Sequence, residues 1–447
     1  MLHSALTGFV LVTALILLVQ SVTSMMQTLY IWDRPERIRA AGRPERYLPP
    51  KHGFTVLLPA RHEAAVIGET LRRLGEAQYP RELIELLVIC TADDLATIEA
   101  AEHAKRRHGL EQVRVVVMQD EPGKSRAMNL GLAEARFELV TIFDSEDDVS
   151  PEIFSIVDTI YQRRAVDVLQ CGVQLMDYDS HWFSGHNVLE YFFWFKSRMH
   201  YFAKEGAVPL GGNTVFFRAD DLRSVGGWDE HGLTEDADLG IRLSLAGRRF
   251  EVMYDAQHVT REEVPHSTRA FVKQRTRWNQ GFLQILRKGE WLKLPSARKV
   301  VLIGSVLIAP SFMAVVIASA PLFILIGATT KLPVLVSLLS FVPLLLAVVM
   351  LLTSVIGLYE FGRDQGIRIS PFRYLLLVLS FIPYQGLLMV SAVRAMTREL
   401  TGSRGWEKTV HTGQHRLGAQ DVQPVPAPVP VALPATMPVP VMIAEAS

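Results

Sequence analysis

The chain contains 447 residues, of which 49% are apolar and 21% are charged, and its mean hydropathy is +0.19. This composition excludes a disordered chain and is more apolar than that of an ordinary soluble enzyme. Lysine plus arginine equals aspartate plus glutamate at 46 residues each, so the chain as a whole has no excess charge for binding nucleic acid. The two cysteines, Cys90 and Cys171, cannot form a disulfide framework and fit a reducing cytosol.

An uncharged stretch predicts a transmembrane helix within residues 1–32. Residues 5–32 would form a helix of about 42 Å, which exceeds the roughly 30 Å hydrocarbon core of a bilayer. The alternative is a cleaved signal peptide, which we disfavour because the run is too long and no basic segment precedes it. Five arginines follow between residues 34 and 46, so the positive-inside rule places that side of the membrane in the cytoplasm.

Residues 51–296 have the composition of a soluble domain, and their first half alternates apolar runs with helical patterns. Short β-branched runs predict buried parallel strands at residues 55–59, 86–90, 113–118 and 139–143. Helical patterns predict crossover helices at residues 64–77, 95–108 and 124–136. The expected fold class is therefore a Rossmann-like α/β domain combined with transmembrane helices.

A second apolar block follows this domain. Residues 300–358 hold two runs that are each long enough to span a membrane. Residues 374–396 are either a further span or an interfacial or re-entrant helix, and we prefer the latter because a span would place the basic residues that follow outside. Residues 420–447 are rich in Pro, Ala and Val, which predicts a disordered tail. We expect a multi-pass protein of the plasma membrane with its soluble domain in the cytoplasm.

An acidic segment follows the expected strand at residues 139–143. Asp144-Ser-Glu-Asp-Asp148 places four carboxylates within five residues. Such carboxylates repel one another, and a divalent cation that also binds phosphate oxygens would neutralise them. The carboxyl end of a parallel strand is where such a site belongs. The alternative is a solvated acidic loop.

Two other expected strand ends also carry polar residues. Pro59-Ala-Arg-His-Glu63 follows the first strand and Asp93-Asp94 follows the second. Carboxylates there suit a base or a ribose, although each segment could simply cap a helix. Glu121–Asn129 opens the third crossover helix, and its Gly123, Lys124 and free helix amides suit a phosphate or a sugar without the spacing of a P-loop.

Three motifs lie in the second half of the soluble domain. Leu210-Gly-Gly-Asn-Thr214 is glycine-rich, and Thr234-Glu-Asp236 places an acidic pair at an apparent helix start. That pair could supply a general base, or only favour the helix dipole. Gln274-Arg-Thr-Arg-Trp278 offers an indole for stacking on sugars and guanidinium groups for a phosphate, or it is an interfacial anchor.

Taken in this order, the motifs resemble those of the membrane-embedded family 2 glycosyltransferases, which include cellulose, chitin and hyaluronan synthases and ceramide glucosyltransferase. The family pattern is an early Asp, a D-x-D loop, a T-E-D motif and Q-x-x-R-W ahead of C-terminal membrane helices. The resemblance covers about residues 30–413. It implies a GT-A glycosyltransferase domain at residues 51–296.

The resemblance also implies a role for each motif. Asp144 and Glu146 would hold Mg²⁺ or Mn²⁺, with Asp147 and Asp148 as rival ligands. Asp236 would be the general base that deprotonates the acceptor, with Glu235 beside it. The residues expected to bind the nucleotide are Pro59, Glu63, Asp93, Asp94 and Lys124. The residues expected to bind donor and acceptor are Gly212, Asn213, Gln274, Arg277 and Trp278.

A gating loop is a further implication of the resemblance. In the cellulose synthases, a cytoplasmic loop that covers the donor follows an interfacial helix. Residues 404–413, with Trp406, Lys408 and Thr409, look like a variant of that loop. A gating loop has to lie in the cytoplasm, which favours the interfacial or re-entrant interpretation of residues 374–396.

The implied reaction is inverting transfer of a sugar from a UDP-sugar to a growing β-linked polysaccharide, with export as a coupled step. One alternative is a single transfer to a lipid acceptor, which the small number of spans favours. Another is a non-catalytic secretion subunit, which we disfavour because the motif carboxylates and the Arg-Trp pair are all present. The expected partners are a UDP-sugar, a glycan or lipid acceptor, membrane lipids, and a second copy of the chain or a secretion partner, without nucleic acid.

Overall fold

Seven strands form the central sheet of the computed structural model, which describes residues 2–119, 121–329 and 333–403. Their order is β3-β2-β1-β4-β7-β5-β8. The first four are β1 (Phe54–Pro59), β2 (Ile84–Thr91), β3 (Val113–Met118) and β4 (Leu139–Ile142), which are parallel as predicted. The side chains of β1, β2 and β4 are mostly buried because helices cover both faces, which explains why these strands are mainly apolar.

The second half of the sheet is mixed. It contains β5 (Val168–Cys171), β7 (Val215–Arg218) and β8 (Phe250–Met253), and β7 runs antiparallel to both β4 and β5. A separate two-stranded parallel sheet pairs β6 (Val173–Leu175) with β9 (Thr260–Glu262). The reversal at β7 matters for function because it brings the segment just before β7 beside the carboxyl end of β4.

The helices of the α/β domain follow the predicted pattern. Those of the first half are α3 (Ile67–Leu74), η2 (Arg81–Leu83), α4 (Leu95–His108), α5 (Lys124–Glu134) and α6 (Ile153–Arg163). The second half adds α9 (Ala219–Ser224), α10 (Glu235–Leu245) and η4 (Glu290–Lys293). The predicted helix at 64–77 is shorter than expected, since α3 begins at Ile67 and ends before Gly75.

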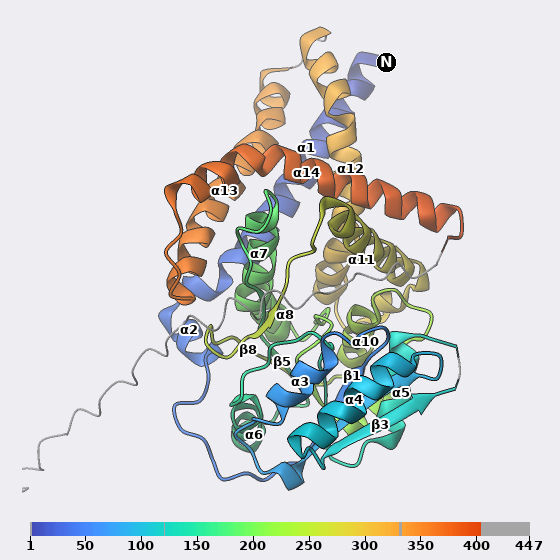
Figure 1. Cartoon of the computed structure of the whole chain (residues 1–447). Coiled ribbons are helices and arrows are strands. Elements are labelled where there is room, and N and C mark those ends of the chain that lie inside the picture. The colour runs from blue at the N-terminus through green and yellow to red at the C-terminus, as the bar shows by residue number, and fades with distance from the viewer. Residues whose placement is uncertain (1, 120, 330–332, 404–447) are drawn as a thin grey trace, which may run out of the picture.

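Four helical elements lie between the sheet and the long helices (Figure 1). They are α7 (Ser184–Phe193), the π-helical turn η3 (Trp194–Arg198), α8 (Met199–Glu205) and α11 (Thr268–Lys288). α7, η3 and α8 follow one another without a break. This layer carries the residues that connect the α/β domain to the apolar part of the chain.

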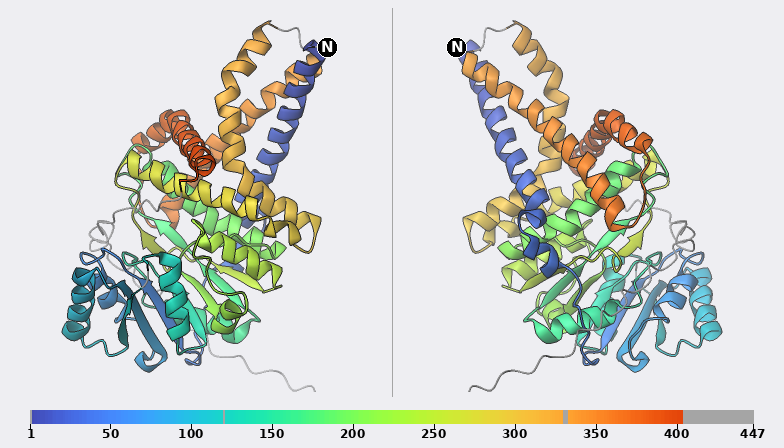
Figure 2. Two further views of the ribbon diagram at one scale, coloured as in Figure 1. Left: turned by 90° about the vertical axis from the view of Figure 1, so that its right-hand side faces the viewer. Right: turned by 90° about the vertical axis from the view of Figure 1, so that its left-hand side faces the viewer.

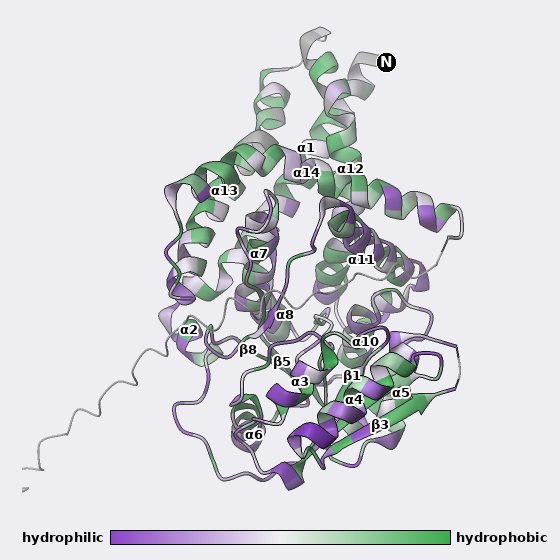
Figure 3. Ribbon diagram, in the orientation of Figure 1, coloured by the Kyte–Doolittle hydropathy of each residue, from purple (hydrophilic) through white to green (hydrophobic). Residues whose placement is uncertain are grey.

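Three long helices project together from the domain in Figure 2: α1 (Leu2–Leu29), α12 (Ala297–Thr329) and α13 (Val334–Asp364). Figure 3 shows that they are largely hydrophobic, whereas the α/β domain is mixed. Within the described residues, three stretches are long and apolar enough to cross a membrane: Thr7–Asp33, Ala297–Ser319 and Pro371–Leu400.

The last described helix, α14 (Pro371–Leu400), lies across this group and not along it (Figures 1 and 2). It packs on α11 and α12. By length and composition it is a candidate span, yet its direction differs from that of α1 and α12. The gating-like segment 404–413 and the tail 420–447 fall outside the described residues.

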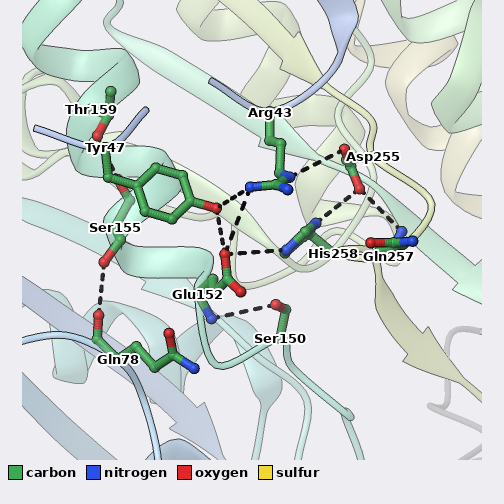
Figure 4. Close-up of polar contacts among 10 residues, drawn as sticks. All are labelled: Arg43, Tyr47, Gln78, Ser150, Glu152, Ser155, Thr159, Asp255, Gln257 and His258. Atoms are coloured by element: carbon green, nitrogen blue, oxygen red, sulfur yellow. Dashed lines mark hydrogen bonds and ion pairs between the residues drawn. The ribbon is translucent and has the colours of Figure 1, made fainter. Parts of the chain in front are cut away.

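The linker from α1 to the sheet is held by polar contacts on the domain surface. It runs through η1 (Tyr30–Asp33) and α2 (Pro35–Ala41). The Tyr47 hydroxyl then donates a 2.5 Å hydrogen bond to Glu152, and His258 contacts both Glu152 and Asp255 (Figure 4). Arg43 lies between the same two carboxylates. The position of the domain relative to α1 is therefore fixed by more than the covalent chain.

Candidate functional site

A single cavity of about 950 Å³ reaches from the carboxyl ends of the strands to the long helices. On the side of the α/β domain, its wall contains most of the residues singled out by the sequence motifs. These are Pro59, Glu63, Lys124, Asp144, Glu146, Gly212, Asn213, Glu235, Asp236, Gln274, Arg277 and Trp278. Segments up to 219 residues apart in sequence therefore share one wall.

The acidic loop after β4 divides its four carboxylates into two pairs. Asp144 and Glu146 line the cavity. Asp147 is fully buried and accepts hydrogen bonds from the backbone N–H of Asp144 (2.8 Å) and from Asn213 (2.9 Å). Asp148 pairs with Arg73 and forms a backbone bridge with β9. Asp147 and Asp148 thus hold the loop in shape, and only the other pair faces the cavity.

Burial of Asp147 has an electrostatic consequence. Burial, together with the nearby charge of Glu262, raises the pKa of Asp147 well above its ordinary value. A protonated Asp147 does not add its charge to the repulsion between Asp144 and Glu146. It is also a poor metal ligand, because a hard cation binds ionised carboxylate oxygens.

Lys124 connects the acidic loop to the acidic pair on α10. Its ammonium group lies 2.5 Å from Asp144. Burial alone would lower the pKa of Lys124, but Asp144 and Glu235 together raise it above its ordinary value. Lys124 is the first residue of α5 and follows Gly123, so the N-terminus of this helix also faces the cavity. This combination suits a phosphate group.

Glu235 and Asp236 occupy the first turn of α10. Glu235 is buried, and burial together with the charge of Asp236 raises its pKa to about 7. Burial also raises the pKa of Asp236, whose Oδ2 accepts a 2.7 Å hydrogen bond from the backbone N–H of Gly212. A carboxylate with a raised pKa in a cavity wall is suited to act as a general base.

The loop before β7 is built around unusual backbone conformations. Gly212 has φ of +44°, and Thr214 has φ of +51°, which a β-branched residue rarely adopts. The Asn213 side chain donates hydrogen bonds to Asp147 and, over 2.6 Å, to Glu262. Strain of this kind persists where surrounding contacts fix the backbone, and it is concentrated at functional sites.

The Gln274–Trp278 segment lies on α11, and its residues divide between the cavity and the protein. Arg275 packs over the Trp278 ring at 4.3 Å and pairs with Glu190. Gln274 lines the cavity, and its buried Oε1 has no hydrogen-bond partner among the described residues. An unpaired buried carbonyl is costly, so this atom fits a bound ligand that donates a hydrogen bond.

The two aspartates after β2 make contacts within the protein. Asp94 caps α4 through the Thr97 N–H and accepts a 2.5 Å hydrogen bond from the His62 N–H, and these bonds lower its pKa against the effect of burial. Asp93 is exposed and pairs with Arg61. Neither aspartate is among the residues that line the cavity, whereas Thr91, at the end of β2, does line it. Their nucleotide contact therefore stays a prediction.

Several cavity residues were not singled out in the sequence. Glu262, Tyr191, Trp194 and Arg198 all line the cavity. The first is a single acidic residue in a short strand, and the others lie in a run of aromatic residues, which alone indicates a hydrophobic core. No signal in the sequence distinguished them. Trp406, Lys408 and Thr409 lie outside the described residues.

Comparison with known families decides the class of this site. The family described as glycosyltransferase like family 2 matches residues 49–281, more than half of the chain. The chain belongs to glycosyltransferase family 2. The predicted family is thus confirmed, and the enzyme is a glycosyltransferase.

Individual relatives of this glycosyltransferase make different products, according to their names. A β-monoglucosyldiacylglycerol synthase of Trichormus variabilis is 27% identical over 395 residues, which cover 83% of this chain and 80% of the relative. A poly-β-1,6-N-acetyl-D-glucosamine synthase of Staphylococcus epidermidis is 24% identical over 243 residues, 54% of this chain and 57% of the relative.

A solved structure supports the fold. A mannosyltransferase of Pyrobaculum calidifontis, in complex with GDP-Man and Mn²⁺, has a TM-score of 0.55 at 19% identity and covers 85% of this chain and 99% of its own. This similarity confirms the predicted GT-A type of α/β fold.

Proposed function

We propose that this glycosyltransferase transfers a sugar from a UDP-sugar to the hydroxyl group of a membrane lipid, with inversion to a β-linkage. The observation that carries the proposal is the cavity, which continues from Asp236 and Trp278 to apolar side chains of α12, α13 and α14. A lipid acceptor needs a polar reaction centre continuous with an apolar surface for its chains. The name of the Trichormus variabilis relative supports diacylglycerol as the first acceptor to test.

The donor half of the cavity suits a nucleoside diphosphate. Asp144 and Glu146 would hold Mg²⁺ or Mn²⁺, since both line the cavity and carboxylate oxygens are the ligands that these cations prefer. Within the described residues no cluster of three or more His, Cys, Asp or Glu could hold a metal, so diphosphate oxygens would have to complete the ligand set. Such a cation neutralises the leaving diphosphate. Glu63 and Lys124 would contact the nucleotide and its phosphates.

The acceptor half supplies the base and the positioning groups. Asp236 would take the proton of the acceptor hydroxyl as its oxygen attacks the anomeric carbon on the face opposite the leaving diphosphate. Gln274 would accept a hydrogen bond from the sugar or the acceptor, and Trp278 would stack on it. Arg277 would balance the charge of the departing diphosphate.

The membrane arrangement that fits this chemistry has the catalytic domain on the cytoplasmic side. The arginines of residues 34–46 favour this orientation through the positive-inside rule. We propose that α14 lies in the interface, since it packs across α11 and α12.

A second candidate is processive synthesis of a β-linked polysaccharide. It is favoured by the staphylococcal relative, whose name describes a polymer synthase. The sequence motifs alone rank this reaction first. We rank it second because hydrogen-bonding side chains line the cavity mainly on the α1 side, whereas the α12 and α13 side is mainly apolar. A glycan channel needs hydrogen-bonding side chains around its length.

Product length separates the two candidates. The purified enzyme in lipid nanodiscs is supplied with Mn²⁺ or Mg²⁺ and a panel of labelled UDP-sugars, with and without diacylglycerol. We expect nucleotide release to depend on diacylglycerol and the product to carry one sugar. A long polymer formed without added lipid would contradict the lipid acceptor and establish the second candidate.

A further inference from the structure

Arg198 lies in the wall of the cavity at its junction with α1. Its Nε donates a 3.0 Å hydrogen bond to Thr28, and its Nη2 donates one to Ser24. The preceding Ser197 binds the same helix, because its hydroxyl donates to the Gln27 carbonyl over 3.0 Å. The end of η3 is thereby fixed to α1, and the guanidinium group has a defined place in the cavity wall.

A short chain of contacts links Arg198 to the catalytic loop. Asp236 accepts a hydrogen bond from Gly212. The neighbouring Gly211 packs so closely on η3 that an added Cβ would lie 2.8 Å from Phe195 and 3.6 Å from the indole nitrogen of Trp194. Trp194 and Arg198 are the first and last residues of η3, one π-helical turn apart. A molecule bound along η3 would extend from Asp236 to Arg198.

The cavity around Arg198 is amphipathic. The side contributed by α1 carries hydroxyl and amide groups: Gln20, Ser21, Thr23, Ser24, Gln27 and Thr28. The side contributed by α12 and α13 is mainly apolar: Val306, Ala309, Met313, Ala314, Ile317, Val349 and Met350. The hydroxyl residues on that side are Ser305, Thr353 and Ser354. This division fits a ligand with a polar head and hydrocarbon chains.

The charge at this point fits a neutral head group. Among the described cavity residues contributed by α1, α12, α13 and α14, none is charged. Burial lowers the pKa of Arg198 from its ordinary value, and the negative charge of Glu190 opposes that effect. Glu190 acts on Arg198 through its charge while it pairs directly with Arg275, so an anionic head group is tested below as a separate outcome. A guanidinium is a planar donor that can bind two oxygen acceptors side by side.

We propose that Arg198, positioned by Ser24 and Thr28, binds the ester carbonyl groups of the acceptor lipid. This inference rests on the proposed function, because it identifies the acceptor as a lipid with ester carbonyls close to its free hydroxyl. Diacylglycerol has two such carbonyls and no donor near them other than that hydroxyl. Arg198 would hold the glycerol backbone so that the hydroxyl faces Asp236 and the chains lie against α12 and α13.

Two acceptors that differ only in the carbonyl groups test the proposal. Transfer to diacylglycerol is compared with transfer to the dialkylglycerol of equal chain length, in which ether links replace the esters. We expect wild-type kcat/KM to favour the diacyl lipid about tenfold or more, as for loss of a hydrogen bond from a charged donor. In Arg198→Met we expect the ratio to fall to about one, because transfer to the diacyl lipid should fall about tenfold more than transfer to the ether lipid.

Two further variants separate recognition from a purely structural tether. Ser24→Ala combined with Thr28→Val keeps the guanidinium group but removes its hydrogen bonds to α1. The ratio of diacyl to ether activity should therefore fall only in part. Met313→Ala, in the apolar wall, should slow both acceptors and leave their ratio at the wild-type value. A structural role for Arg198 alone would slow both acceptors equally.

Three outcomes would overturn the inference. An unchanged ratio of diacyl to ether activity in Arg198→Met would show that this residue does not recognise the ester carbonyl groups. A wild-type preference for phosphatidylglycerol over diacylglycerol that Arg198→Met abolishes would make the site a phosphate site. If the enzyme transferred sugar to a glycan and to no lipid, both this inference and the proposed function would be overturned. If it transferred sugar to lipid with an unchanged diacyl-to-ether ratio in Arg198→Met, only the inference would be overturned.

Discussion

At the scale of single residues, Asp236 is the group whose loss should stop the reaction. Asp236→Asn keeps an oxygen that can accept the hydrogen bond from Gly212, so the loop should stay in place, but the amide cannot take a proton. We expect the transfer rate to fall about 100-fold or more. Binding of UDP, measured by calorimetry, should stay at the wild-type level.

Asp238 offers a matched control on the same helix. It is buried and pairs with Arg242 and Lys288, so Asp238→Asn should lower thermal stability with a smaller effect on kcat. If Asp236→Asn retained full activity, the assignment of Asp236 as the base would be wrong.

Glu235 should make folding stability depend on pH. Its pKa is raised from 4.5 to about 7, so the folded chain binds this proton more tightly than the unfolded chain does. A carboxyl of this kind contributes stability fully below pH 4.5 and loses that contribution as the pH rises through about 7. The side chain at position 235 is neutral at every pH in Glu235→Gln. The thermal midpoint of this variant minus that of the wild type should therefore increase between pH 5 and pH 8. A difference that stays constant over this range would show that the raised pKa is wrong.

The acidic loop shows how far single residues can be assigned from sequence. Four carboxylates within five residues indicate a negative charge that a cation would neutralise. The resemblance to the D-x-D motif singles out Asp144 and Glu146 as its ligands. Only the fold explains why Asp147 does not compete with them. Its carboxyl is turned inward by Asn213, which lies 66 residues away, and no local pattern encodes that contact.

At the scale of elements, one glycine sets the distance between α10 and α11. A Cβ on Gly281 would lie 2.3 Å from the Thr234 hydroxyl, so α11 could not keep its present position. Gly281→Ala should push α11, with Gln274 and Trp278, away from Asp236. We expect a lower thermal midpoint and a loss of transfer activity of about tenfold or more, because small misplacements of catalytic groups are costly.

A second-site change tests this explanation. Thr234→Ala removes two of the three atoms that an alanine at position 281 would meet. It should restore part of the activity in the double variant, while having a smaller effect alone. Equal activity in Gly281→Ala and the double variant would contradict a steric cause.

Element type was predictable where a pattern repeats over several residues. The four parallel strands and their crossover helices follow from buried β-branched runs and helical spacing, and β1 to β4 lie where predicted. The antiparallel strand β7 was not predicted, because its four residues Val215–Arg218 carry no turn signal that fixes direction. The direction of α14 is likewise set by its packing on α11 and α12 and not by its hydropathy.

At the scale of the whole molecule, the site depends on contacts between the catalytic domain and the apolar helices. Arg198 and Thr28 are 170 residues apart, and Gln280 of α11 binds Glu399 of α14 across 119 residues. Such contacts cannot be predicted from one sequence, since each partner alone fits an ordinary exposed or capping role. They explain why the cavity extends between domain and helices, although the motifs identified only its catalytic end.

The buried ion pair between Lys196 and Asp364 joins η3 to the end of α13. Lys196 is 8% exposed and is surrounded by the rings of Trp32, Phe192 and Tyr254. Removing one partner leaves a buried charge, so Asp364→Asn should cost about 3 kcal/mol of unfolding free energy. Thermal unfolding in nanodiscs measures this loss, and faster proteolysis of residues 365–370 would show that α13 detaches first.

The neighbouring Arg363 provides the control for this prediction. Its side chain is 60% exposed and pairs with Glu360, so Arg363→Gln should change stability by less than about 1 kcal/mol. A double variant, Lys196→Met with Asp364→Leu, removes both charges and should regain most of the stability that Asp364→Asn loses. If Asp364→Asn were as stable as Arg363→Gln, the ion pair would not hold the helices on the catalytic domain, and the linker contacts around Tyr47 and His258 would have to do so.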